Sequence, residues 1–269
     1  MNKRGLFWGG ALILLGLLFL LDTLGVFEFL GVSLWGLILP ALLILIGIWL
    51  IWSIFARQKN PQSEQVTIPD DGIQRAELVI NHGAGRLIIS ADPMQFNLLE
   101  GSFGGGVEHD SQRSAGTVKI KLTMVSDFFR KFPGIWGLQQ SLDWNMRFKP
   151  TARYVFVLNT GASESRIDLT NLLVDSVSIK TGASSTELAL PQAAGFTTVK
   201  VRSGASSLSI KVPGNVAARI RATGGMMDMN IDKSRFPRSG VYHQSNDYDM
   251  ADNKVDLEIE TGVGSVKIW

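Results

Sequence analysis

The chain has 269 residues, 45% of them hydrophobic, a formal net charge of +2 and no cysteine, which excludes disulfides, zinc–thiolate sites and thiol nucleophiles. Residues 1–60 hold four basic and two acidic side chains, so the totals of 26 and 24 leave 22 of each sign in the remainder. A domain with balanced charge lacks the basic face that binds a phosphate backbone, and we therefore expect no nucleic-acid partner.

Two apolar segments open the chain. Residues 6–21 and residues 32–55 contain no charged side chain. A helix needs about 20 residues to cross the hydrocarbon layer of a bilayer, and the first segment reaches that length by continuing to Phe27. Tryptophans stand near the segment ends, as interfacial anchors do: Trp8, Trp35, Trp49 and Trp52. We predict a two-helix transmembrane hairpin over residues 1–57, embedded in a lipid bilayer.

Basic residues flank this hairpin on both sides, Lys3 and Arg4 before it and Arg57 and Lys59 after it, whereas the loop between the spans carries only acidic side chains. By the positive-inside rule, both termini and the domain that follows are expected in the cytoplasm. A cleaved signal peptide is the alternative for residues 1–21. No small-residue cleavage site follows and a second apolar segment comes next, so a retained hairpin is favoured.

Residues 58–73 are polar and contain Pro61 and Pro69, which predicts an exposed linker. Beyond them, apolar and polar side chains alternate with a period of two, the pattern of half-buried strands. We therefore predict an all-β domain over residues 74–269.

A repeat runs through this domain. Six glycines anchor it: Gly83, Gly161, Gly182, Gly204, Gly225 and Gly262. An apolar residue stands five and three positions before and six positions after every anchor, and the central spacing is 21 or 22 residues. This pattern is typical of a β-solenoid-like stack of strand–turn–strand units with glycine corners. Glycine suits a corner because it tolerates positive φ and allows close stacking of successive coils.

Two stretches depart from the period. Between Gly83 and Gly161 we expect two additional strands, over residues 118–124 and 142–148, after a glycine-rich piece. Between Gly225 and Gly262 a polar loop of about 20 residues interrupts the ladder.

Gly-Ala-Ser recurs at three corners and places serines at equivalent positions: Ser163, Ser184 and Ser206. A nucleophile elbow needs Gly-x-Ser-x-Gly between a strand and a helix, with a histidine and an acid as partners. Here Glu164 and Ser165 follow the first serine, and the motif recurs at the structural period. This favours an architectural role, so we expect no catalytic residue, no cofactor and no enzyme activity.

Metal sites find little support. Five oxygen-bearing side chains cluster in the polar loop: Asn246, Asp247, Asp249, Asp252 and Asn253. A calcium site is conceivable there, but the loop lacks the glycine and terminal glutamate of an EF-hand, which favours a solvated insertion. The three histidines are far apart in sequence: His82, His109 and His243. None has a second ligand at a suitable spacing, so we expect no metal site.

An aromatic stretch lies over residues 128–136, where Phe128, Phe129, Phe132 and Trp136 stand beside Arg130 and Lys131. We favour the interpretation that it caps an open end of the solenoid, because terminal units must be covered. Contact with the membrane interface is the alternative.

The hairpin sequence WGGALILLGLLFLLDTLGVF followed by LWGLILPALLILIGIWLIW resembles the transmembrane region shared by LiaI- and LiaF-type bacterial proteins. The portion from Trp144 to Pro213, including WNMRFKPTARYVFVLNTGASESRIDLTNL and TGASSTELALP, is similar to the LiaF-like, or toast-rack, domain. The resemblance implies a bacterial protein of the inner cell membrane that senses or modulates cell-envelope stress. LiaF-type members restrain a membrane histidine kinase through protein contact; they often have four spans, whereas this chain shows two.

Two classes of function therefore remain open. The first is a regulatory protein whose β-domain contacts a protein partner, such as a membrane histidine kinase. The second is a structural, adhesin-like scaffold that self-associates into a homo-oligomer through the ends or edges of its solenoid.

Overall fold

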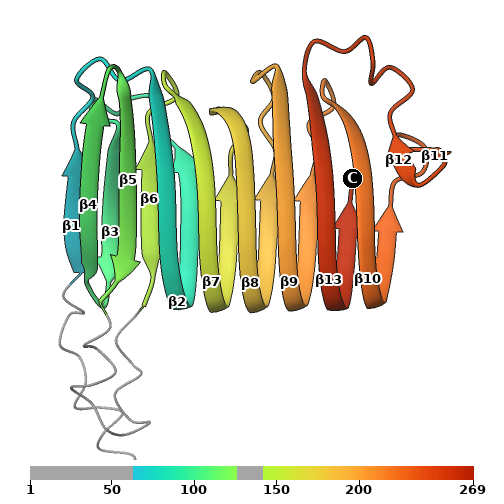
Figure 1. Cartoon of the computed structure of the whole chain (residues 1–269), viewed down its shortest axis with the longest axis horizontal. Helices are drawn as coiled ribbons and strands as arrows, with labels where there is room; N and C mark the ends of the chain where they lie inside the picture. The colour runs from blue at the N-terminus through green and yellow to red at the C-terminus, as the bar shows by residue number, and fades with distance from the viewer. Residues whose placement is uncertain (1–62, 126–141) are drawn as a thin grey trace, which may run out of the picture. The chain divides into compact units, whose positions relative to one another are not determined.

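The computed structural model describes residues 63–125 and 142–269. The predicted hairpin over residues 1–57 and the aromatic stretch over residues 128–136 lie outside them. Within the described residues, no helix is long and apolar enough to cross a membrane. These residues form a single mixed β-sheet, so the predicted all-β domain is confirmed (Figure 1).

Thirteen strands make up the sheet. In chain order they are β1 (Ser63–Ile68), β2 (Arg75–Ala91), β3 (Leu99–Gly104), β4 (Val107–Ser114), β5 (Thr117–Met124), β6 (Trp144–Phe148), β7 (Arg153–Asp168), β8 (Leu173–Ala189), β9 (Phe196–Lys211), β10 (Ala217–Ile231), β11 (Arg238–Ser239), β12 (Tyr242–Gln244) and β13 (Lys254–Ile268). The expected additional strands are β5 and β6, which begin and end within two residues of the predicted bounds.

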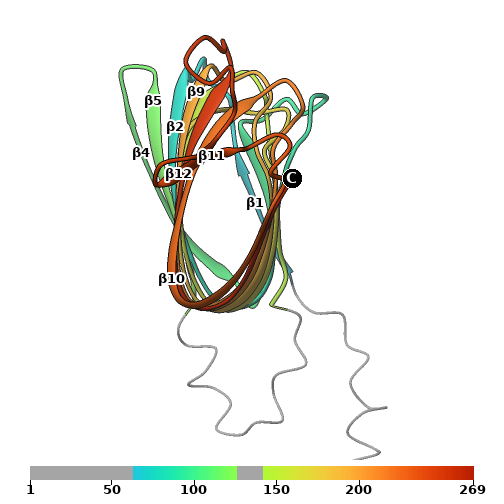
Figure 2. The same cartoon turned by 90° about the vertical axis from the view of Figure 1, so that its right-hand side faces the viewer.

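Six of these strands are long, and each folds over one of the anchor glycines into two arms: β2, β7, β8, β9, β13 and β10. They stack in parallel, and seen along the stack their arms form a U with the bends at its base (Figure 2). The sequence pattern predicted two strands joined by a tight turn. The parallel pairing instead continues around the bend, from Thr160 opposite Thr181 to Ala162 opposite Ala183. Each unit is therefore one continuous bent strand.

The repeat positions of the sequence form the core. All eighteen apolar positions are buried except Ala222, which is partly buried against the same cluster. Side chains alternate between the two faces of a strand, so these residues fill the inside of the U from both arms. The apolar positions of the repeat therefore form the core of the stack, as the pattern of half-buried strands predicted.

Close stacking explains the corner glycines. A Cβ on Gly161 would lie 2.3 Å from the carbonyl oxygen of Gly83, and one on Gly182 would lie 3.1 Å from that of Gly161. None of the six anchors has a positive φ. The expected tolerance of positive φ is therefore not what selects glycine here. At five of the anchors the approach of successive backbones does so; Gly83 is the exception, since an added Cβ there would meet only the sulfur of Met124 at 3.7 Å.

The order of the coils departs from the order of the sequence. The sheet runs β2, β7, β8, β9, β13, β10, so the last strand of the chain inserts between β9 and β10. Val263 of β13 pairs with Ala205 on one side and with Met226 on the other. This insertion makes β10 the terminal coil.

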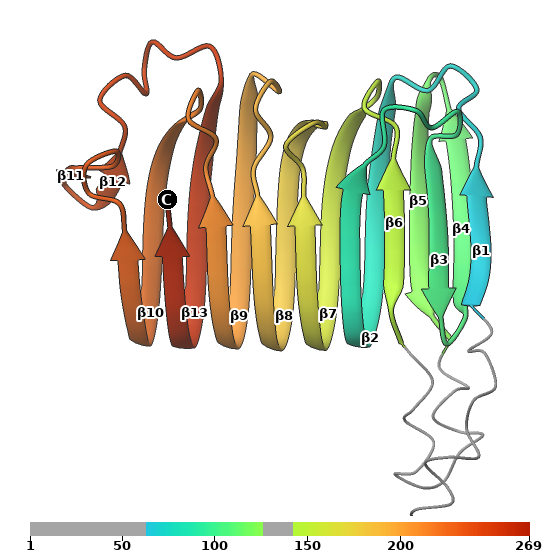
Figure 3. The ribbon, with the colours of Figure 1, turned by 180° about the vertical axis from the view of Figure 1, so that it is seen from behind.

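At the opposite end, the first arm of β2 pairs with β5, which forms a hairpin with β4, and its second arm pairs with β6. Strands β3 and β1 continue beyond β6 in antiparallel pairing (Figure 3). The glycine-rich piece supplies the turn between β3 and β4, where Gly105 and Gly106 both have positive φ.

Strand β1 lies within the segment 58–73, which the sequence predicted to be a linker. Val66 and Ile68 are buried and pair with Gly101 and Leu99 of β3. Two apolar residues at alternate positions give too short a pattern to distinguish a strand from a linker in sequence. The β-domain therefore includes residues from Ser63 onward.

Candidate interaction surface

The recurring serines lie at the bends, and their hydrogen bonds within the described residues go to other hydroxyl groups. Ser163 Oγ lies 3.4 Å from Ser165 Oγ, and Ser206 Oγ lies 2.7 Å from Ser203 Oγ. Thr186 Oγ1 donates to Ser184 Oγ at 3.5 Å. The arrangement supports the architectural interpretation of the Gly-Ala-Ser corners.

The three histidines lie on separate strands and do not come together. His109 is exposed on β4. On β12, Nδ1 of His243 lies 3.1 Å from the carbonyl oxygen of Phe236. His82 is only 1% exposed; its Nε2 lies 3.0 Å from the carbonyl oxygen of Leu142, and its ring centroid lies 5.0 Å from that of Trp144. Burial lowers the pKa of His82, which keeps it neutral in the fold.

This burial predicts a loss of stability in mild acid. An unfolded histidine titrates near pH 6.5, and the folded pKa of His82 lies below that value. The unfolded chain therefore takes up a proton that the folded chain does not. The contribution is complete above pH 6.5, and each pH unit below it should cost up to about 1.4 kcal/mol until the folded pKa is reached. Urea unfolding at pH 7.0, 6.0 and 5.5, where carboxylates stay ionised, measures this.

The His82→Leu variant is the matched control, because it removes the titrating group and should flatten the pH dependence. A parent protein with the same urea midpoint at pH 7.0 and 5.5 would contradict the prediction.

The polar loop over residues 232–253 exposes most of its clustered oxygen-bearing side chains, as expected of a solvated insertion, but the loop is also folded. It contains the β11–β12 hairpin and buries Phe236 and Tyr248. Asn253 Oδ1 accepts a hydrogen bond from the backbone N–H of Gly195 at 3.0 Å. The described chain contains no group of three or more histidine, aspartate and glutamate side chains placed to hold a metal ion. We call this segment, residues 232–253, the end cap.

Arg219 fastens the end cap to β10 and β13. Its guanidinium donates from Nε and Nη2 to the carboxylate oxygens of Asp256 at 2.8 and 2.6 Å, and it lies 5.0 Å from the ring of Tyr248. The hydroxyl of Tyr248 donates to the same carboxylate at 2.5 Å. The hydrogen bond with Asp256 raises the pKa of Arg219, while burial and then Asp256 raise the pKa of Tyr248, so both groups stay protonated.

The Arg219→Met variant should therefore loosen the end cap without unfolding the coil. We expect hydrogen exchange to accelerate about tenfold across residues 232–253, because the bidentate pair and the stacking on Tyr248 are lost together. Amides of β7 and β8 should keep their protection. Arg166→Met is the matched control, since the ion pair of Arg166 with Glu187 at 2.9 Å is exposed and worth little. Equal exchange in both variants would refute this role of Arg219.

The end cap covers only one arm of the terminal coil. Strand β12 pairs with β10 at Arg219 and Ile220. The second arm of β10, residues 226–231, pairs with β13 on one side and with no other strand of the described chain. Met226 is 74% exposed and Met229 is 41% exposed. We call residues 226–231 the open edge.

The sheet edges at the opposite end have a different character. Strand β4 exposes every residue from Glu108 to Ser114, four of which are ionisable. The exposed positions of β1 are polar: Ser63, Glu64, Gln65 and Thr67. Charged and polar side chains on an edge strand discourage pairing with another chain. The open edge of β10 is thus the edge with exposed apolar side chains.

A pocket of about 490 Å³ adjoins the open edge. Its lining residues are Met229, Ile231, Lys233, Pro237, Arg238 and His243. The first two come from the open edge and the other four from the end cap, so the pocket lies where the cap leaves the second arm uncovered. It contains three basic or titratable nitrogen groups and no carboxylate.

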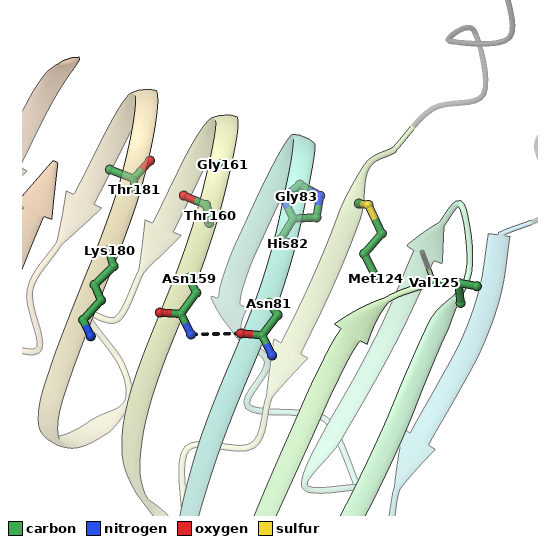
Figure 4. A pocket seen from close by; sticks show the side chains of 10 residues that line it. All are labelled: Asn81, His82, Gly83, Met124, Val125, Asn159, Thr160, Gly161, Lys180 and Thr181. Carbon is green, nitrogen blue, oxygen red and sulfur yellow. Dashed lines mark hydrogen bonds between the residues drawn. The ribbon is translucent and has the colours of Figure 1, made fainter. Parts of the chain in front are cut away.

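A second pocket, of about 550 Å³, lies at the bends of β2, β7 and β8 (Figure 4). There Asn159 donates to Asn81 at 2.9 Å, and Asn81 donates to Thr123 at 3.2 Å. Its wall ends at Val125, next to residues 126–141, which the structure does not describe. The pocket at the open edge is lined by described residues and is the better-defined candidate site.

Sequence reasoning missed this site. Two signals point toward it: three methionines occur within residues 226–229, and a long polar segment follows that unit of the repeat. Neither reveals that the second arm of β10 is an edge, because that depends on where β13 inserts.

The fold defines the chain as a repeat module of the β-solenoid type. Residues 57–211 match the family model Toast_rack_N, the N-terminal domain of toast_rack (DUF2154), and because the match spans more than half of the chain, the protein belongs to this family. The β-domain also resembles a crystal structure from Clostridium sporogenes of a protein with a proposed role in cell adhesion. The TM-score is 0.69 at 19% identity, covering 77% of this chain and 98% of the other. No curated protein sequence matches the chain.

At 19% identity the structural resemblance concerns the fold alone. The family match ends at residue 211, the last residue of β9. The terminal coil, the end cap and β13 lie beyond it, so the open edge is a feature of this chain outside the matched region.

Proposed function

We propose that this chain is a non-enzymatic bacterial membrane protein that senses or modulates cell-envelope stress, with its β-domain acting as a protein-interaction module. Residues 1–57 provide two membrane spans and place the β-domain on the cytoplasmic side, as their flanking basic residues favour. The partner is a membrane protein of the stress response, such as a histidine kinase, whose activity the contact restrains. Membership of the toast-rack family and the resemblance to LiaF-type proteins support this proposal.

The observation that carries the interaction role is the contrast between the two ends of the stack. The β1 and β4 edges are polar, whereas the open edge exposes Met226 and Met229, the second of which lines a pocket. Exposed apolar side chains on an unpaired strand commonly mark a contact surface, because they gain from burial and the backbone gains hydrogen bonds.

Photo-crosslinking in living cells tests the proposal. A photoreactive amino acid at position 226 of the full-length protein should give crosslinks to a membrane signalling protein, and the same probe at Gln112 of the polar β4 edge should not. Deletion of the gene should also change the output of an envelope-stress reporter under cell-wall antibiotics. An unchanged reporter, together with equal crosslinking from both positions, would overturn the proposal.

Self-association is the second candidate function, and the same open edge favours it, since an unpaired strand can template a second copy. Sedimentation of the full-length protein in detergent distinguishes the two. A monomer across a wide concentration range agrees with regulation, whereas concentration-dependent polymers agree with a scaffold.

A further inference from the structure

We infer that the open edge accepts an extended segment of the partner protein as an added β-strand, with an apolar side chain in the adjoining pocket and an acidic side chain beside Lys233 and Arg238. This inference rests on the proposed function and specifies the chemistry of the partner. It requires unpaired backbone N–H and C=O groups on β10, a pocket for the side chains of the added strand, and cations without ion-pair partners. The structure provides all three.

The backbone groups follow from the pairing with β13. The N–H of Asp232 donates to the carbonyl oxygen of Ile268 at 3.0 Å. In a parallel ladder, alternate residues direct their N–H and C=O groups to the same neighbour. Residues 228 and 230 therefore bond to β13, and Met227, Met229 and Ile231 direct theirs away from it. These are the groups that an added strand would pair with.

The place for side chains is the pocket of about 490 Å³. Ile231 is buried and Met229 is partly exposed, so together they form an apolar wall that continues the core. An added strand would direct every second side chain toward this wall. Methionine adapts its shape to the group it meets, which suits a wall that receives different apolar side chains.

The unbalanced charge comes from the end cap. Lys233 and Arg238 line the pocket, and neither forms an ion pair with any residue of the described chain. Arg238 donates from Nε to the carbonyl oxygen of Gly240 at 3.3 Å, which leaves its charge unbalanced. A carboxylate on the incoming segment would complement both cations.

Nearby carboxylates do not supply this balance. Asp232 accepts hydrogen bonds from the hydroxyl and the backbone N–H of Ser234 at 2.5 and 3.0 Å. Asp228 lies one position from Met229 and so belongs to the opposite face of β10.

A second copy of this chain fits the surface less well than a distinct partner. On the face of β10 that includes Ile231, the open edge of another copy would offer Met227, Met229 and Ile231. None of these side chains carries a carboxylate. At the opposite end of the described sheet, the acidic edge residues lie on β4, whose exposed run lacks apolar residues at alternate positions, and at Glu64 of β1. The carboxylate of Glu64 already accepts a hydrogen bond from the backbone N–H of Val107, and the apolar residues of β1 are buried in the core. The occupant that satisfies both the pocket and the charge is an extended, acidic segment of another protein.

Peptide binding to the full-length protein in detergent tests the inference. The probe is a fluorescent peptide of about eight residues, in which valine alternates with threonine and two glutamates stand at the end. Its fluorescence anisotropy measures binding. We expect Met229→Pro to weaken binding at least about tenfold, because it removes an outward N–H, and Met229→Ala to weaken it about threefold, because the N–H remains. Proline is tolerated at this position of an edge strand, and circular dichroism checks the fold.

Charge reversal keeps the test decisive if the proline variant does not fold. The protein with both Lys233→Glu and Arg238→Glu should lose the glutamate peptide and bind the same peptide with two lysines instead. Absence of binding to the parent protein, or equal affinity of the Pro and Ala variants, would overturn the inference. Dimers that Met229→Pro dissociates without peptide would also overturn it, in favour of a second copy. In either case the stress reporter and the crosslinks still test the proposed function independently.

Discussion

The Gly161→Ala variant is expected to lower the free energy of unfolding by about 3 kcal/mol or more. The added Cβ would lie 2.3 Å from the carbonyl oxygen of Gly83, a distance far inside normal contact. The clashing atom belongs to the backbone of the neighbouring coil, so relief requires β2 and β7 to separate at the bend. Because their parallel pairing continues through that bend, the separation also strains hydrogen bonds on both arms.

Gly214→Ala is the matched control for this substitution. A Cβ at Gly214 would meet no atom within 4 Å, and Gly214 does not have a positive φ. The control should unfold at the parent's urea midpoint or slightly above it, since alanine reduces the entropy of the unfolded chain. Urea unfolding of the full-length protein in detergent, followed by tryptophan fluorescence, measures both variants. Equal midpoints for the two would refute the stacking explanation.

Glycine period and apolar alternation predicted the units of this fold but not their order. Leu78, Val177 and Val199 stand at the same distance from their anchors and are equally buried, so the pattern identifies each coil. Because the coils are so alike, any coil can stack on any other with similar apolar contacts. The pattern therefore does not tell which coils are neighbours. The insertion of β13 between β9 and β10 therefore could not be obtained from spacing alone.

The candidate site exists because β13 inserts between β9 and β10, which the sequence did not predict. Had the coils stacked in chain order, β10 would pair with β9 and β13, and Met229 would lie inside the sheet. The end cap was equally difficult to foresee. Its polar composition predicted a solvated loop, yet Phe236 and Tyr248 are buried, and Asp256 binds both Arg219 and Tyr248. Such contacts join residues from different coils, and a local pattern does not encode them.

Burial, and not aromatic character, should decide the effect of removing a phenylalanine, and Phe156→Ala is expected to destabilise the protein by about 3–5 kcal/mol. Phe156 is 1% exposed on the first arm of β7, where its ring stacks on Tyr154 at 5.7 Å and meets the edge of Phe148 at 5.3 Å. Truncation leaves a cavity between β6 and β7, and these rigid rings, held by the sheet, cannot fill it. The loss therefore includes both the buried area and the aromatic contacts.

Phe96→Ala provides the same chemical change without the burial. Phe96 is 90% exposed in the connection between β2 and β3, so its truncation should shift the urea midpoint by no more than the equivalent of about 0.5 kcal/mol. A Phe156 variant as stable as the Phe96 variant would mean that the aromatic cluster beside β6 contributes little to folding. A large loss for Phe156 alone would show that this end of the stack, where the parallel coils meet the antiparallel strands, is part of the same cooperative core. Folding would then depend on the buried core, and the exposed side chains of the open edge at the other end could change without loss of stability.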